Sequence, residues 1–106
     1  MTNPRLDAFR KMLAANPDNV LARFGLANEA VKEGLLEEAR DHYRAYLAGY
    51  DDEGNGWARL AEVLVRLGET AEAKDALRRG IEASHRFGHH GMMQELEVRL
   101  EELERE

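Results

Sequence analysis

The sequence repeats itself with a period of 34 residues. Shifting residues 20–53 by that distance onto residues 54–87, without a gap, superposes eight identical residues, where unrelated helices of this composition would share about two or three. A period of this length corresponds to one supersecondary unit, which buries its apolar face only by stacking on its neighbours. A short helical-repeat array is therefore expected. The matched pairs are Leu26/Leu60, Ala27/Ala61, Val31/Val65, Gly34/Gly68, Glu38/Glu72, Ala39/Ala73, Asp41/Asp75 and Arg44/Arg78.

The apolar residues predict helices throughout. They recur at spacings of three and four, and alternating strand-like runs are missing. Gly34 and Gly68 are expected to end helices in a left-handed conformation, and Gly88 with Gly91 to interrupt the chain before the last helix. The sequence predicts a three-turn helix between Pro4 and Asn16, then helices over residues 20–33, 36–48, 54–67, 71–84 and 92–105.

Composition excludes several functional classes. The 21 acidic and 15 basic residues give a net charge of -6, the wrong sign for attraction to nucleic acid or to an anionic membrane. There is no cysteine and only one serine, Ser84, so neither a thiolate site nor a nucleophile in a suitable motif can be nominated. We therefore expect no catalytic residue, no cofactor and no membrane span. Since no signal peptide is visible either, a cytoplasmic location is expected.

A two-helix unit of 34 residues with a glycine turn, carrying Trp57, Leu60-Ala61, Gly68 and Ala73, resembles the tetratricopeptide repeat (TPR) family. Arg23 and Tyr46 depart from that pattern, since tryptophan and a small residue are usual at their positions. The resemblance implies an all-α fold, a short right-handed α-solenoid. Residues 1–106 would form a single domain, with a half repeat at 1–19, full repeats at 20–53 and 54–87, and a capping helix at 88–106.

The resemblance also implies an interaction surface. Family members bind peptides or partner helices on a concave groove lined by the first helix of each repeat, so a protein partner is expected. Asn28 would pair with peptide amides, Arg59 would hold a carboxylate, and Phe24 would anchor an aliphatic side chain. A clamp for an acidic C-terminus is disfavoured, because Phe24 and Gly25 stand where cationic or asparagine residues are expected. The groove residues would be Leu21, Phe24, Asn28, Val31, Lys32, Asn55, Ala58, Arg59, Glu62, Val65 and Arg66.

Two stretches raise the question of metal binding. Residues 51–62 have the spacing of a calcium-binding EF-hand loop, but the 34-residue period requires the second half of that stretch to be helical, and an acidic helix N-terminus is preferred. His85, His89 and His90 have a spacing compatible with two ligands on one helix face, yet Gly88 interrupts the helix between them. No metal site is predicted.

The last predicted helix carries an apolar stripe at three-four-three spacing, formed by Met93, Leu96, Leu100 and Leu103. Two interpretations remain. The preferred one is that the stripe caps the array by packing on the second repeat, since two heptads are short for an independent coiled coil. The alternative is a homodimer interface.

Overall fold

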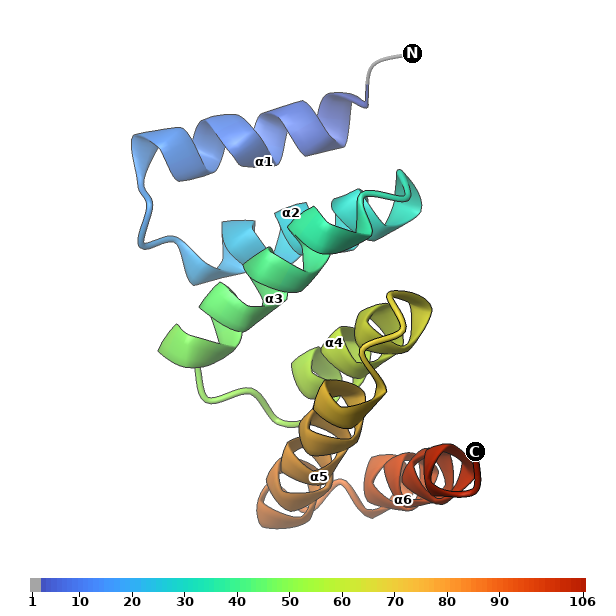
Figure 1. Ribbon diagram of the computed structural model, residues 1–106. Coiled ribbons are helices and arrows are strands. Elements are labelled where there is room, and N and C mark those ends of the chain that lie inside the picture. Colours follow the sequence, from blue (N-terminus) through green and yellow to red (C-terminus); the bar gives the residue numbers. More distant parts are fainter. Residues whose placement is uncertain (1–2) are drawn as a thin grey trace. The chain divides into compact units, whose positions relative to one another are not determined.

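The computed structural model describes residues 3–106, which form six α-helices and no strand (Figure 1). The predicted all-α class is confirmed. The first two residues of the predicted half repeat lie outside the described part. None of the helices over residues 3–106 combines the length and apolar character needed to cross a bilayer. The helices are α1 Pro4–Ala15, α2 Val20–Lys32, α3 Leu36–Gly49, α4 Asn55–Arg66, α5 Thr70–Arg86 and α6 His90–Glu104.

Local signals place most helix ends where the sequence predicts them. The Asn3 side chain accepts hydrogen bonds from the backbone N–H groups of Arg5 and Leu6 at the start of α1, and Asn19 does the same for Ala22 in α2. These caps satisfy donors that have no partner within the helix. Gly34 and Gly68 follow α2 and α4 with φ of 75° and 77°, as expected of glycine-terminated helices.

Two glycine predictions are wrong. Gly91 does not interrupt the chain but lies in the first turn of α6, because Gly88 alone, with φ of 77°, makes the turn. The backbone N–H of His89 then donates to the carbonyl of Ser84 over 2.7 Å, which closes the end of α5. Gly54 is not the first helical residue but precedes α4 with φ of 126°.

The chain divides into two compact units, with the boundary between Tyr50 and Asp51. Unit 1 holds α1 to α3, and unit 2 holds α4 to α6. The boundary falls three residues before the predicted end of the first full repeat at residue 53. The organisation of residues 1–106 as one domain stays a prediction.

In unit 1, α2 packs against both neighbouring helices. Leu6 and Leu13 of α1 form a core cluster with Ala22 and Leu26 of α2, and Phe9 packs against its edge. Small residues of α2 and α3 are completely buried, which allows the helices to approach closely. These residues are Ala27, Ala30 and Ala39, each 0% exposed.

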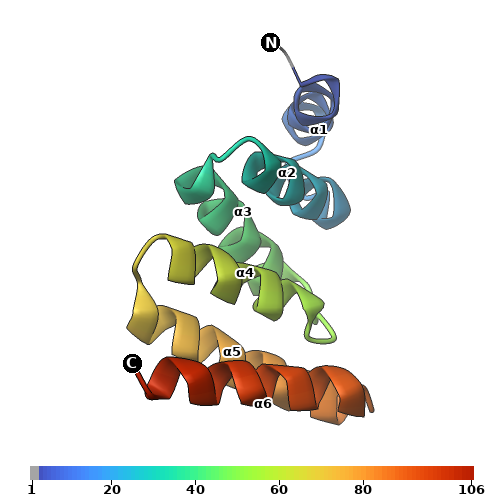
Figure 2. The same cartoon turned by 90° about the vertical axis from the view of Figure 1, so that its right-hand side faces the viewer.

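In unit 2, α6 lies alongside α5 (Figure 2). Leu96 and Leu103 of α6 are buried. A Cβ atom at Gly80 of α5 would stand 3.0 Å from Leu96 Cδ1 and 3.1 Å from Trp57 Cβ of α4, so glycine is what allows the three helices to meet. The apolar stripe of α6 therefore packs within unit 2, as the capping interpretation requires.

A substitution at Gly25 tests the contact between α1 and α2. A Cβ atom there would lie 2.5 Å from Cε1 and from Cζ of the Phe9 ring. Gly25→Ala is therefore expected to destabilise the protein by about 1–3 kcal/mol through overpacking. In a Phe9→Ala background the obstacle is absent, and the same change should stabilise by up to about 1 kcal/mol through helix propensity. Urea titration of the four proteins measures both values, and an equal effect in the two backgrounds would contradict this contact.

Candidate peptide-binding faces

The predicted groove residues of unit 1 form one stripe along α2. Leu21, Phe24, Asn28, Val31 and Lys32 follow one another at helical spacing, on a side of α2 different from the one that packs on α1. Leu21 is 68% exposed, and Lys32 is also exposed, whereas the other three are half-buried. The structure thus brings these five predicted residues together on one face.

Several residues of this stripe also hold unit 1 together. The Tyr43 hydroxyl donates a hydrogen bond to Asn28 Oδ1. The Phe24 ring lies 5.9 Å from the ring of Tyr43 and 4.6 Å from that of Tyr46, centroid to centroid, and Tyr46 in turn stacks on Tyr50 at 5.3 Å. Phe24 therefore presents only part of its ring to solvent, and Leu21 is the most exposed apolar side chain of the α2 stripe.

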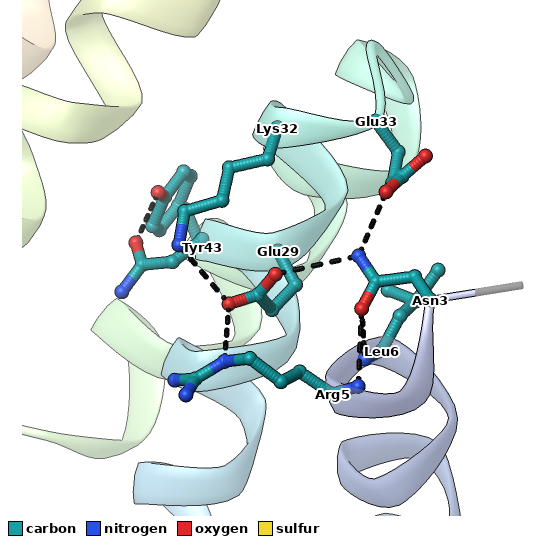
Figure 3. A network of polar contacts seen from close by, with 8 residues as sticks. Asn3, Arg5, Leu6, Glu29, Lys32, Glu33 and Tyr43 are labelled. Atoms are coloured by element: carbon teal, nitrogen blue, oxygen red, sulfur yellow. Dashed lines mark hydrogen bonds and ion pairs between the residues drawn. The ribbon is translucent and has the colours of Figure 1, made fainter.

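A charged network that sequence reasoning missed joins α1 to α2 (Figure 3). Glu29 is 3% exposed, although nothing in the sequence distinguishes it from the exposed glutamates. Its carboxylate accepts hydrogen bonds from Arg5 Nε over 2.8 Å, from Lys32 Nζ over 3.2 Å and from Asn3 Nδ2 over 3.4 Å. The Arg5 hydrogen bond, against the opposing effect of burial and with help from Lys32 and Asn3, lowers the pKa of Glu29.

This pKa shift predicts how stability depends on pH. Because the folded pKa of Glu29 lies below its ordinary value of 4.5, its contribution is complete above that value and is lost as the pH falls through the folded pKa. Glu29→Gln should therefore lower the melting temperature at pH 7, and the gap from the unmodified protein should close on acidification. Thermal melts in steps from neutral to acid pH measure this. Glu37→Gln, at an exposed position, is the control; a gap that is independent of pH would contradict the assignment.

The predicted groove residues of unit 2 form the corresponding stripe along α4. Asn55, Arg59, Glu62 and Arg66 are exposed, while Ala58 and Val65 are half-buried. Glu62 Oε2 lies 3.9 Å from Arg99 Nη2 of α6. The C-terminal helix thus reaches the lining face of α4, a contribution that the sequence did not indicate because the 34-residue register fails after residue 87.

The acidic stretch before α4 is a capping structure. Asp52 is 6% exposed, and its Oδ1 accepts hydrogen bonds from the backbone N–H groups of Gly54 and Gly56 over 2.8 and 2.7 Å. Asp51 accepts two hydrogen bonds from Arg86. Since α4 begins at Asn55, the second half of the calcium-loop pattern is helical, as the 34-residue period requires.

The histidines lie at the junction of α5 and α6. His89 Nε2 is 2.7 Å from Glu53 Oε1, and the rings of His85 and His90 are 6.3 Å apart, centroid to centroid, in an edge-to-face arrangement. Over residues 3–106 no group of three or more histidine, aspartate or glutamate side chains has a geometry suited to a metal ion.

Comparison with known proteins shows which repeat proteins this chain resembles. No family model matches the sequence. The chain is 29% identical over 100 residues to the TPR repeat-containing protein PA0015 of Pseudomonas aeruginosa, an alignment that covers 94% of this chain and 95% of that protein. The chain is thus similar to a TPR protein over nearly its whole length. This similarity agrees with the family resemblance of the sequence.

Solved structures agree with this similarity. Protein BPP2914 of Bordetella parapertussis is 30% identical, with a TM-score of 0.80, over 99% of this chain and 90% of that one. The Sgt2 TPR domain of Aspergillus fumigatus is 20% identical, with a TM-score of 0.72, over 95% of this chain and 69% of that one. The second likeness shows that the chain has the fold of a TPR domain. The division into full repeats at 20–53 and 54–87, with α2 and α4 as their first helices, stays a prediction.

Proposed function

We propose that this protein is a non-enzymatic interaction module that binds a short peptide or a partner helix through the open faces of α2 and α4. The observation that supports this most is the open face of α2, where the 68% exposed Leu21 lies one turn from the partly exposed ring of Phe24. An exposed apolar side chain rimmed by polar ones is typical of the centre of a binding surface.

The face of α4 supplies different chemistry. Arg59 and Arg66 are exposed and stand two turns apart, and Glu62 between them is paired with Arg99. Arginine recognises carboxylates through a planar, two-pronged set of donors. The face of α2 therefore suits an apolar anchor of a ligand, and the face of α4 suits an acidic group or a carboxylate. Each TPR motif supplies one lining helix, so a brief segment is favoured over a long wrapped one.

The test is the double variant Leu21→Ser with Arg59→Glu. Asn28→Ala is unsuitable, because it would remove the acceptor of the buried Tyr43 hydroxyl and so confuse binding with stability. Peptides are first selected on the unmodified protein from a display library of random 12-residue sequences. Their affinity for the variant should then fall by about tenfold or more, as expected when two central contacts are lost.

A matched control places the same two kinds of substitution elsewhere. Leu35→Ser with Arg78→Glu changes one exposed leucine and one exposed arginine outside the stripes on α2 and α4, and it should leave peptide affinity unchanged. Equal binding to the test variant and the unmodified protein would disprove the assignment to these faces. Failure to select any peptide would count against peptide binding altogether.

The alternative to peptide binding is self-association through the apolar stripe of α6. Met93 and Leu100 are half-buried, and Leu96 and Leu103 are 7% and 1% exposed within unit 2. A homodimer that uses this stripe would require α6 to leave α5, with the loss of those contacts. The stripe is therefore better explained by capping, and the homodimer stays a prediction, disfavoured by this burial.

A further inference from the structure

The second helix of each TPR motif buries two register positions that α1 leaves uncovered. α1 stands one period of 34 residues before α3, so Arg5 and Met12 are equivalent to Ala39 and Tyr46, which are 0% and 4% exposed. In α1 the Arg5 side chain is 72% exposed and Met12 is 46% exposed. Ala8, Lys11 and Ala15 are exposed on the same side. Within the described residues α1 is thus a second helix without a first one.

α6 packs like the first helix of a motif. It begins at His90, within one residue of a full period after the start of α4 at Asn55, and it packs on α5 through Leu96 and Leu103. It is therefore placed as the first helix of a further motif, and no second helix follows it within the described residues. The side of α6 opposite the buried leucines carries Gln94, Glu97, Val98 and Glu101, all exposed; Val98 is 54% exposed.

We propose that the uncovered face of α1 receives the outer face of α6 from a second copy of this chain, so that two half motifs complete one TPR motif between molecules. The contact is heterologous, since each copy uses one surface to donate and a different one to receive. It goes beyond the proposed peptide binding and does not depend on it.

Charge complementarity favours a second copy as the occupant. α1 carries three basic residues and one acidic residue, whereas α6 carries five acidic residues and one basic residue. The receiving face places Met12 between two alanines with Arg5 and Lys11 at its margins. The donating face places Val98 beside Glu97 and Glu101. Opposite charges around a small apolar centre orient two surfaces and raise their rate of encounter. Arg5 is also held in place by its ion pair with Glu29 at 2.8 Å.

Sedimentation of the 106-residue protein tests the proposal. Between about 10 and 500 μM, a range that covers the dissociation constants of weak interfaces, the weight-average mass should rise from the 12.0 kDa of one chain to at least twice that value. Met12→Glu on the receiving face and Val98→Lys on the donating face should each keep the protein monomeric. An equimolar mixture of the two variants should associate again, because each retains the face that the other lacks.

The control is Leu21→Glu, which places a charge on an even more exposed apolar residue of the α2 face and should not alter the mass. Met12 and Val98 are both exposed, and a thermal melt of each variant checks that it folds. An unmodified protein that stays monomeric across the range would overturn the proposal. So would a Met12→Glu variant that still dimerises alone, as a symmetric contact through α6 predicts, or a mixture of the two variants that stays monomeric.

Discussion

Replacing Gly54 by alanine should lower the free energy of unfolding by about 2–6 kcal/mol, since backbone strain and overpacking each cost about 1–3 kcal/mol. Gly54 has φ of 126°, a conformation that residues with a Cβ atom rarely adopt. A Cβ atom there would stand 2.8 Å from Met92 Sδ, 3.0 Å from Ser84 Oγ and 3.2 Å from the carbonyl oxygen of Gly80. The backbone oxygen cannot move without disturbing α5. Urea titration followed by circular dichroism measures the loss.

The variant Gly68→Ala separates the cost of backbone strain from the cost of overpacking. Gly68 also has positive φ, at 77°, but a Cβ atom there would meet nothing within 4 Å. Its replacement should therefore cost only the backbone term, about 1–2 kcal/mol. If the two variants lose the same stability, the close approach of α5 and α6 to the start of α4 contributes nothing, and the packing described for unit 2 is incorrect.

Truncating Leu77 to alanine should destabilise the protein by about 2–5 kcal/mol, the range for large-to-small changes in a packed core. Leu77 is 1% exposed and lies in the middle of α5, the helix that packs against both α4 and α6. Removal of its branched end leaves a cavity that helices held on both sides cannot close. Since small domains have only about 5–15 kcal/mol of stability in total, a large fall in melting temperature is expected.

Leu21→Ala is the matched control for this core truncation. The two leucines lose the same atoms, but Leu21 is 68% exposed, so its replacement should change stability by no more than about 0.5 kcal/mol. A similar loss in both variants would mean that Leu21 is buried in solution. That result would also count against its role as an exposed anchor for a peptide.

Most of the fold could be predicted because repeated local signals agree with one another. Glycines at positions 34 and 68 end helices, Asn19 caps α2, and each repeat places small residues where two helices approach closely. The prediction failed at the turn between α5 and α6. Gly91 resembles a helix breaker in sequence, but Gly88 already makes the turn, and a helix tolerates a glycine in its first turn.

The candidate binding faces, too, could be predicted only in part from the sequence. Helical spacing alone places Leu21, Phe24 and Asn28 on one side of α2, and the structure agrees. The sequence could not show that Phe24 and Asn28 are engaged by Tyr43, fifteen or more residues away. Nor could it show that Arg99 of α6 reaches Glu62 on α4, because the register fails after residue 87. These contacts decide which side chains can be changed in a binding test without loss of stability.

The sequence by itself determined the period, the helices and the face of each helix that packs, because propensity, capping and apolar spacing act within a few residues. Only the tertiary structure decided which polar groups are buried and which glycines are indispensable. Glu29 is buried because Arg5, Lys32 and Asn3 converge on its carboxylate. Gly25 and Gly54 are required because side chains from other helices occupy the space of a Cβ atom. Both depend on distances between helices, and residue spacing along one helix carries no information about those distances.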